Sequence, residues 1–390
     1  MIGLPRMRIG LLVYGEMETL SGGYLYNRKL VSYLRRRGEE VEIISLPPRN
    51  YWRHLGDNFR KNCPRLIAAA NLDILIQDAM VHPSVFRINR RLGRQAELPV
   101  VTLVHLLTAF DRHPWYSAWF YRAVERRYLL SVAGMIANSQ TTLAQARELL
   151  QPRAKLPPHC LATPAGDHFS GVSMDLDAVT QRALASGPLQ ILVVGNVIRR
   201  KGLHVLVRAL RQLAAEDFQA TVVGRLDMEP RYVKHIQKLI RDERLQERII
   251  LRGPVRDQAL AELYRQHHLL VLPSAYESYG IAYVEAQQFG LPAIGTTAGA
   301  AGEIIGHGEN GYLIAPEDQH ALAGHLQKLH RQRPLLLDLS RNALAAFARH
   351  PGWDRNCEII RQYLYARLNG WEPGAANRGR GLLLGKAGEY

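Results

Sequence analysis

Short apolar runs alternate with amphipathic stretches along the first half of the chain. The runs are almost continuously apolar, which is typical of strands that helices cover on both faces of a parallel sheet. They predict five strands, at residues 9–13, 41–46, 72–77, 100–105 and 135–137. Ser21 is the predicted N-cap of a helix whose apolar positions are Tyr26, Leu30, Tyr33 and Leu34. Three arginines and Gly38 then predict its C-terminal end, because cations and glycine favour that position.

The pattern breaks in residues 151–187, which are rich in Pro, Ala and Gly, and then begins again. Five further strands are predicted at residues 189–194, 218–223, 249–251, 269–272 and 292–295. Helices are predicted between and after them at residues 202–213, 231–241, 258–265 and 281–289, and a terminal helix at 353–368. Two α/β domains of the doubly wound type are the simplest architecture for this order.

The expected organisation is an N-terminal Rossmann-like domain (1–170), a linker (171–187) and a second Rossmann-like domain (188–350). A C-terminal helix (351–370) is expected to pack back toward the first domain, and the Gly-rich tail (371–390) to be loosely ordered. Ligands of such sheets bind at the carboxyl ends of the strands, so a cleft between two sheets can hold two substrates.

Composition narrows the functional classes. The 390 residues have a net charge of +15, and residues 1–170 hold 23 Lys and Arg against 13 Asp and Glu. A basic N-terminal half favours an anionic partner, namely nucleic acid, an acidic membrane surface or an acidic substrate, unless the charge only keeps the surface solvated. The three cysteines are far apart in sequence, so we expect neither disulfides nor a cysteine-based zinc site. The 15 histidines do not show the spacing of metal ligands, so we expect no metal site from them either. With no apolar run of about 18–20 residues and no signal-peptide core, a cytoplasmic protein is expected.

Residues 273–316 contain the most informative motif. Glu277 directly precedes a predicted helix, and Glu285 falls about one turn inside it. The helix start near Gly280 presents free N–H groups and a positive dipole end, which suit a phosphate or a sugar oxygen. Two carboxylates beside that start can accept hydrogen bonds from hydroxyl groups. The predicted ligand is therefore polyhydroxylated and phosphorylated.

This segment strongly resembles the E-x7-E signature of family-4 retaining glycosyltransferases, with Glu277 and Glu285 as the two acids. Residues 290–292, 297–305 and 308–316 follow the same family pattern. The resemblance implies the GT-B fold, in which two doubly wound Rossmann-like domains face each other across a cleft. It also implies that Glu285 holds the ribose hydroxyls of a nucleotide and that Glu277, as a catalytic residue, contacts the donor sugar. Further donor-binding residues would be Ser278, Tyr279, Gly280 and Ile281.

A second loop, residues 195–202, follows a predicted strand and places cations beside a helix start, which suits a diphosphate leaving group. Lys201 matches the diphosphate-binding lysine of the family and is assigned a catalytic role. The family arginine is replaced by Asn196, which is kept among the donor-binding residues. Arg199 or Arg200 would then supply the missing charge, and Arg200 is included in the expected donor site.

The N-terminal half offers three more positions. Gly22 and Gly23 open the first predicted helix, where absent side chains let a ligand approach the backbone. The family has a comparable glycine pair there. His105 ends the strand that begins at residue 100, and a comparable histidine of the family lies near the transferred sugar, so His105 is a third candidate catalytic residue.

The resemblance implies a retaining, metal-independent hexosyl- or related transferase, with no cofactor beyond a UDP- or GDP-type donor sugar. The reaction would be a front-face displacement in which the departing diphosphate takes the acceptor proton. The acceptor is a hydroxyl compound, and a lipid or glycan at the cytoplasmic membrane face is one option. Aromatic and basic residues occur together in residues 51–66 and 110–127, which fits peripheral membrane binding if the aromatics are not core residues.

Three other readings stay open. The chain can be a glycosyltransferase with a small soluble acceptor, a non-catalytic module that binds sugar nucleotides, or a basic nucleic-acid-binding protein. The last class lacks support because no RNP or helix-turn-helix signature accompanies the charge. A dehydrogenase is excluded because neither Gly-containing loop has the G-x-G-x-x-G pattern. Donor base, donor sugar, acceptor and oligomeric state are all left open.

Overall fold

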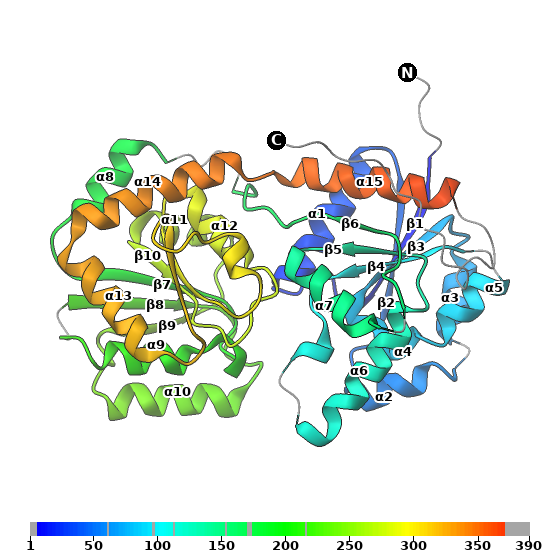
Figure 1. The fold of residues 1–390 in the computed structure, drawn as a ribbon, viewed down its shortest axis with the longest axis horizontal. Coiled ribbons are helices and arrows are strands. Elements are labelled where there is room, and N and C mark those ends of the chain that lie inside the picture. The colour runs from blue at the N-terminus through cyan, green and yellow to red at the C-terminus, as the bar shows by residue number, and fades with distance from the viewer. Residues whose placement is uncertain are drawn as a thin grey trace. The chain divides into compact units, whose positions relative to one another are not determined.

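The computed structural model describes residues 6–60, 62–95, 98–111, 114–152, 154–169, 174–214 and 217–370 (Figure 1). The chain forms two compact units, and each is built around its own sheet. Unit 1 comprises the chain up to Ala162 together with the chain from Cys357 onward, and unit 2 comprises Thr163–Asn356. The expected division at residue 170 thus falls eight residues earlier, between Ala162 and Thr163.

Unit 1 contains a six-stranded parallel sheet with the order β2-β1-β3-β4-β5-β6. Leu11 of β1 lies opposite Ile76 of β3. The strands are β1 (Arg8–Tyr14), β2 (Glu40–Leu46), β3 (Ile74–Asp78), β4 (Val100–Val104), β5 (Gly134–Ala137) and β6 (His159–Leu161). The helices are α1 (Gly22–Arg36), α2 (Tyr51–Asp57), α3 (Asn62–Ala69), α4 (His82–Val85), α5 (Ile88–Gln95), α6 (Trp115–Leu129), α7 (Gln140–Leu150) and α15 (Trp353–Asn369). All residues of β3, β4 and β5 are buried, as expected for a parallel sheet that is covered on both faces.

The first helix shows why the local sequence folds as predicted. The Ser21 hydroxyl accepts a hydrogen bond from the Tyr24 N–H, which caps the N-terminus of α1. The predicted apolar face is buried, including Tyr26 and Leu30. At the other end Gly38 has φ +88°, a left-handed conformation that glycine adopts without strain, and its N–H donates to the Arg35 carbonyl.

Unit 2 contains a second six-stranded parallel sheet, with the order β12-β11-β10-β7-β8-β9. Numbered within the unit, this is the 3-2-1-4-5-6 order of the Rossmann fold. Leu192 of β7 lies opposite Leu270 of β10. The strands are β7 (Leu189–Val194), β8 (Phe218–Val223), β9 (Ile249–Gly253), β10 (Leu269–Val271), β11 (Ala293–Thr296) and β12 (Gly311–Ile314). The helices are α8 (Leu176–Leu184), α9 (Leu203–Leu210), α10 (Pro230–Asp242), α11 (Asp257–Gln266), α12 (Ile281–Gln288), α13 (Gln319–Arg331) and α14 (Arg333–Arg349).

The predicted strands are all present, and two further strands extend the sheets. Both additions, β6 and β12, are short edge strands of three and four residues. Residues 159–161 of β6 have no long apolar run, and the short apolar run of β12 lies within the motif at residues 308–316. The segment expected to be a linker, residues 171–187, contains α8, whose Val179 and Ala183 are buried in the core of unit 2. The expected tail, 371–390, lies outside the described residues.

From Cys357 onward, α15 packs on the sheet of unit 1. The Tyr363 hydroxyl donates to the Pro158 carbonyl (2.6 Å) and accepts from the Met135 N–H (3.0 Å). The buried Glu39 carboxylate accepts hydrogen bonds from Arg361 Nε (2.7 Å) and from the Tyr365 hydroxyl (2.9 Å). It also accepts from the backbone N–H of Met7 (2.8 Å). The C-terminal helix is therefore tied to the start of β1 and β2.

Glu39→Ala tests this attachment. Removing the carboxylate leaves the Arg361 guanidinium with only its longer contact to Glu358 (3.5 Å) and the buried Tyr365 hydroxyl without this acceptor, so the free energy of unfolding should fall by about 3 kcal/mol. Glu42→Ala, three residues away and exposed, is the matched control and should change it by less than about 0.5 kcal/mol. Urea unfolding followed by circular dichroism measures both, and equal effects of the two variants would contradict the attachment.

Candidate functional site

The candidate site of unit 2 lies where the strand order reverses, between β7 and β10. Loops that follow two adjacent strands at such a switch point diverge, and ligands of Rossmann-like sheets bind there. The loop after β7 and the loop after β10 are joined by backbone hydrogen bonds. Ala275 N–H donates to the Arg200 carbonyl (2.8 Å), and the Arg200 guanidinium donates to the Tyr276 carbonyl (3.0 Å). The two sequence motifs are thus brought together.

Lys201 and Glu277 form an ion pair at this point, with 2.6 Å between Lys201 Nζ and Glu277 Oε2. The Ser274 hydroxyl donates to the same carboxylate oxygen at 3.3 Å. Burial alone would raise the pKa of Glu277. The Lys201 and Arg200 charges and the two hydrogen bonds outweigh burial, so the pKa lies below its ordinary value of 4.5. Glu277 is therefore an ionised, buried carboxylate that holds a cation at the carboxyl edge of the sheet.

The backbone of Glu277 is held by the segment after β11. Glu277 N–H donates to the Ala298 carbonyl (3.1 Å), and Ala300 N–H donates to the Glu277 carbonyl (2.8 Å). Gly299 lies between these partners with φ +94°, and a Cβ there would collide with the Glu277 carbonyl. Glycine is required at this position because both the backbone conformation and the close approach exclude a side chain. This requirement explains part of the motif after residue 296.

The donor-binding residues expected after Glu277 surround the start of α12. Gly280 is the N-cap, with φ +97°, and a side chain there would collide with the Tyr283 ring. The buried Tyr279 side chain points away from the helix start, because its hydroxyl bonds to His350 Nε2 at 2.7 Å. Ser278 is partly exposed and Ile281 packs partly buried against the core. Gly280 itself therefore adds no side chain at the start of α12, where no side chain caps the first N–H groups of the helix.

Asn196 occupies the family arginine position in a structural role. Its side-chain oxygen accepts from the Arg225 N–H (3.2 Å), which links the loops after β7 and β8. Arg199 is exposed, and its backbone N–H donates to the Glu229 carboxylate. The charge of Arg200, in contrast, helps to lower the pKa of Glu277. Of the two arginines, Arg200 is therefore the one that acts on the Glu277 carboxylate.

Glu285 lies on α12, and each of its buried carboxylate oxygens has a polar side chain beside it. The Tyr264 hydroxyl donates to Oε2 (2.6 Å), and His168 Nε2 lies 3.3 Å from Oε1. A carboxylate accepts about four hydrogen bonds, so further lone pairs stay available for a ligand. Sequence reasoning missed Tyr264 and His168. Tyr264 occupies an apolar position of an amphipathic helix, and His168 is far from Glu285 in sequence, so neither had a local signal.

Unit 1 has its own polar cluster at the carboxyl ends of β3 and β4. His105 Nε2 lies 3.0 Å from the Asn27 side-chain oxygen, and the Asn27 amide donates to Asp78 (2.8 Å). Because Asp78 only accepts, the Asn27 amide nitrogen faces it and the oxygen faces His105. His105 Nε2 must then be the protonated nitrogen, which makes Nδ1 the acceptor. A Cβ on Gly23 would lie 3.2 Å from the imidazole, so glycine leaves the room that His105 needs.

Burial favours the neutral form of His105. Burial lowers the pKa of His105 below its ordinary value of 6.5, and the nearby Asp78 carboxylate offsets only part of this effect. Gly22 is exposed at the start of α1, next to Gly23. The two glycines and the histidine predicted from sequence therefore lie at one edge of the sheet, together with Asn27 and Asp78, which were not predicted.

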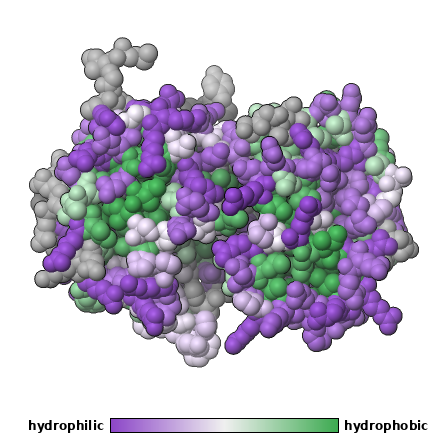
Figure 2. Space-filling model, turned by 180° about the vertical axis from the view of Figure 1, so that it is seen from behind, coloured by the Kyte–Doolittle hydropathy of each residue, from purple (hydrophilic) through white to green (hydrophobic). Residues whose placement is uncertain are grey.

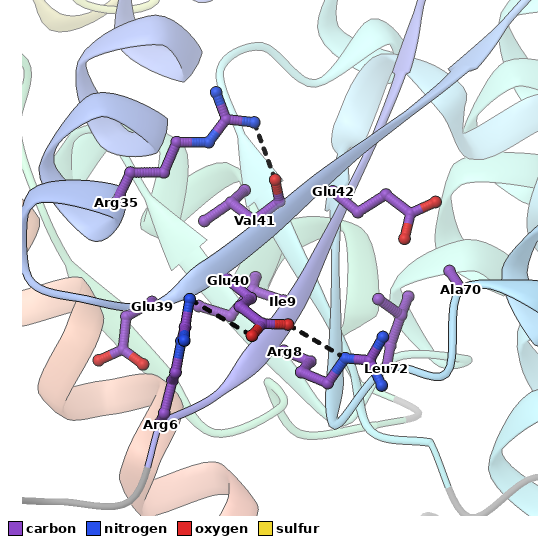
Figure 3. A pocket seen from close by; sticks show the side chains of 10 residues that line it. All are labelled: Arg6, Arg8, Ile9, Arg35, Glu39, Glu40, Val41, Glu42, Ala70 and Leu72. Carbon is purple, nitrogen blue, oxygen red and sulfur yellow. Dashed lines mark hydrogen bonds and ion pairs between the residues drawn. The ribbon is translucent and has the colours of Figure 1, made fainter.

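A separate hollow of about 440 Å³ in unit 1 lies at the opposite, amino-terminal ends of β1 and β2 (Figure 3). Glu40 pairs there with Arg6 and with Arg8, at 3.3 Å in each case. Arg35 donates to the Val41 carbonyl. The hollow is remote from the carboxyl edge of the sheet, where such sheets bind ligands. We do not assign it a ligand.

Within the described ranges, no group of three or more His, Cys, Asp or Glu residues is arranged to hold a metal ion. Nor does any helix in the same part of the chain combine the length and the apolar character needed to cross a membrane.

Lys201→Met tests the ion pair through its pH dependence. Without Lys201 the pKa of Glu277 should rise, because burial is then opposed only by the Arg200 charge and the Ser274 hydrogen bond. A carboxyl group whose pKa is higher in the folded protein than in the unfolded chain stabilises the fold at low pH. This stabilisation is complete below the pKa of the unfolded chain and is lost as the pH rises through the pKa of the folded protein. The variant should therefore unfold at nearly the wild-type temperature at pH 4, and be less stable by about 3 kcal/mol at pH 8.

Thermal unfolding from pH 4 to pH 8 measures the difference. In the matched double variant, Lys201→Met with Glu277→Gln, the loss should no longer depend on pH. A loss in Lys201→Met of the same size at pH 4 and pH 8 would contradict the pairing.

Known proteins resemble the chain in sequence and in structure. Residues 178–345 match the family described as glycosyl transferases group 1. D-inositol 3-phosphate glycosyltransferase from Pseudarthrobacter chlorophenolicus is 29% identical over 187 residues, which cover 47% of this chain and 44% of that protein. The chain therefore spans less than half the length of this curated relative.

Solved structures align over almost the whole chain. Sucrose-phosphate synthase from Thermosynechococcus elongatus is 20% identical, with a TM-score of 0.79 over 93% of this chain and 99% of that one. HepE from Anabaena, solved with UDP and glucose, is 20% identical, with a TM-score of 0.72 over 92% of this chain and 99% of that one. Residues 178–345 are therefore similar to glycosyl transferases group 1, and the two parallel sheets of the chain have the GT-B fold.

Proposed function

We propose that the protein is a retaining glycosyltransferase that moves a sugar from a UDP- or GDP-type nucleotide sugar to a hydroxyl acceptor. The observation that supports this most is the Lys201–Glu277 ion pair at the β7/β10 switch point. A cation beside an uncovered helix start can bind a diphosphate, and an ionised carboxylate can accept hydrogen bonds from sugar hydroxyls. The match of residues 178–345 to glycosyl transferases supports the same class.

In this proposal Lys201 binds the diphosphate and Arg200 supplies the charge that Asn196 lacks. The N–H groups at Gly280 contact the phosphates, and Glu277 contacts the donor sugar. Glu285, held by Tyr264 and His168, accepts from the ribose hydroxyls. Tyr264 and His168 are positioning residues because they act on the nucleotide only through Glu285. HepE was solved with UDP and with UDP-glucose, which makes UDP-sugars the first donors to examine.

The proposed chemistry is a front-face displacement. The bond between the anomeric carbon and the departing diphosphate breaks, and the acceptor oxygen forms its bond on the same face. The acceptor proton passes to an oxygen of the leaving diphosphate. Lys201 and the start of α12 stabilise the developing negative charge, a role that a bound metal ion plays in other enzymes. We therefore propose a metal-independent reaction that rests on positioning and electrostatics.

Unit 1 is proposed to receive the acceptor. His105 is neutral, and its free Nδ1 can accept a hydrogen bond from a substrate hydroxyl, so the Asn27–Asp78 pair positions the acceptor nitrogen. The basic charge of residues 1–170 favours an anionic acceptor or surface. A lipid or glycan at the cytoplasmic membrane face is the acceptor class that we favour over a small soluble molecule.

Two substitutions test the donor site. Glu285→Ala and Lys201→Met should each weaken nucleoside diphosphate binding by about 1.5–3 kcal/mol, because each removes a charge-assisted hydrogen bond. Isothermal titration calorimetry with UDP and GDP measures the change. Glu262→Ala and Lys238→Met, which alter exposed charges of the same unit, are matched controls that should bind like the wild type. Unchanged affinity in a folded Glu285→Ala protein would refute its assignment to the ribose.

A further inference from the structure

Five large aromatic side chains of unit 1 are exposed, although a soluble surface normally leaves such residues scattered singly. They were expected to be either membrane-facing or core residues, and the structure excludes the core for all five. Their exposed fractions are 59% for Trp52, 72% for Phe59, 88% for Trp115, 65% for Tyr116 and 67% for Trp119. The other aromatics of the two stretches, such as Phe120 and Tyr121, are partly buried.

The partly buried rings join α2 and α6 into one surface. Trp52 of α2 stacks on Phe120 of α6, with 5.2 Å between ring centroids, and Tyr51 lies 4.5 Å from Tyr121. Helix α4 contacts both α2 and α6 beneath them. We call the exposed rings of α2, residue 59 and the first two turns of α6 the aromatic surface. Figure 2 shows a pale protrusion at the lower end of unit 1, where α6 begins in Figure 1.

The exposed charges on the helices that form the aromatic surface have one sign, although Arg122 of α6 pairs with the exposed Glu148 of α7 at 3.0 Å. In the described residues between 51 and 66 and between 114 and 130, the only acids are Asp57 and Glu125, and both are buried. Asp57 accepts from Ser84 and pairs with Arg49 (2.9 Å). Glu125 accepts from two backbone N–H groups, and burial raises its pKa to about 7.

Cations, in contrast, are exposed in the same stretches, at Arg53, Arg60, Arg65 and Arg127. Arg87 adds a further guanidinium, which lies over the Phe59 ring at 4.7 Å from its centroid. The aromatic surface is therefore apolar and cationic, with no exposed carboxylate on the helices that form it.

We propose that the aromatic surface binds the headgroup region of an anionic lipid bilayer. Indole and phenol rings favour this region because they are apolar in body and polar at one edge, and exposed cations attract anionic headgroups. The positive charge of the exposed groups on the aromatic surface favours a negatively charged partner. An anionic bilayer surface is extended enough to contact all five rings and the flanking arginines at once. The inference rests on the proposed function in one respect: if unit 1 receives the acceptor, binding of unit 1 to a bilayer implies that the acceptor is lipid-linked.

Sedimentation with vesicles of phosphatidylcholine and 30% phosphatidylserine, about a third anionic lipid, tests the proposal. The wild-type protein should sediment with these vesicles at low salt, be released at about 0.5 M NaCl because charge is screened, and not bind pure phosphatidylcholine. Trp115→Ala with Trp119→Ala should lower the partition coefficient about tenfold. Arg53→Glu with Arg127→Glu should lower it as much and remove the salt dependence.

Matched controls come from unit 2. Met228→Ala with Ile250→Ala removes exposed apolar side chains, and Arg231→Glu with Lys234→Glu reverses exposed charges; both should bind vesicles like the wild type. Nucleoside diphosphate affinity of the tryptophan variant should be unchanged, which separates this inference from the donor-site assignment. Absence of binding to anionic vesicles at low salt would overturn the proposal. Binding of the tryptophan variant to vesicles as strong as that of the wild type would also overturn it. The same holds if the wild type does not bind vesicles but forms a dimer that the tryptophan substitutions abolish.

Discussion

The ion pair between Lys201 and Glu277 is the interaction on which the candidate donor site depends. A carboxylate as buried as Glu277 is costly without a cation, and a lysine beside it is held in one place by the same attraction. The strand order makes the pair possible because β7 and β10 are neighbours although some 75 residues separate the two side chains. The remaining contacts, from Arg200, Ser274 and residues 298–300, fix the two loops around it.

In unit 1, as in unit 2, buried polar side chains at the carboxyl edge of the sheet are paired with one another. Polar side chains at the carboxyl ends of β3 and β4 are buried, and each has a partner that fixes its orientation, from Asp78 through Asn27 to His105. The exposed residues follow a different rule, because the rings of α2 and α6 are left to solvent on a surface without exposed acids. Ordered polar groups at the sheet edge and an apolar, cationic outer surface are the two features of unit 1 that packing alone does not explain.

Much of the fold was predictable because the strands of a doubly wound sheet are short, apolar and separated by helices. The bounds of β7 and β8 agree with the prediction, and the cap at Ser21 was found from residue type alone. Strand β6 was missed because its residues are only half covered and need no long apolar run, and β12 because its few apolar residues lie within the motif at residues 308–316. Tyr264 and His168 were missed for another reason: their role depends on contact with Glu285, which only the folded chain brings about. The Asn196 departure could be seen in the sequence, but its hydrogen bond to residue 225 could not.

The central claim is that a lysine and a helix start, rather than a metal ion, stabilise the leaving diphosphate. The most direct test is the rate of nucleoside diphosphate release from an accepted nucleotide sugar after exhaustive chelation with EDTA, for the wild type and for Lys201→Met. We expect the wild type to keep its full rate and the variant to lose about 100-fold or more, the size of effect seen when one charge-stabilising donor is removed. Loss of the wild-type rate in EDTA, with recovery on adding Mg²⁺ or Mn²⁺, would contradict it.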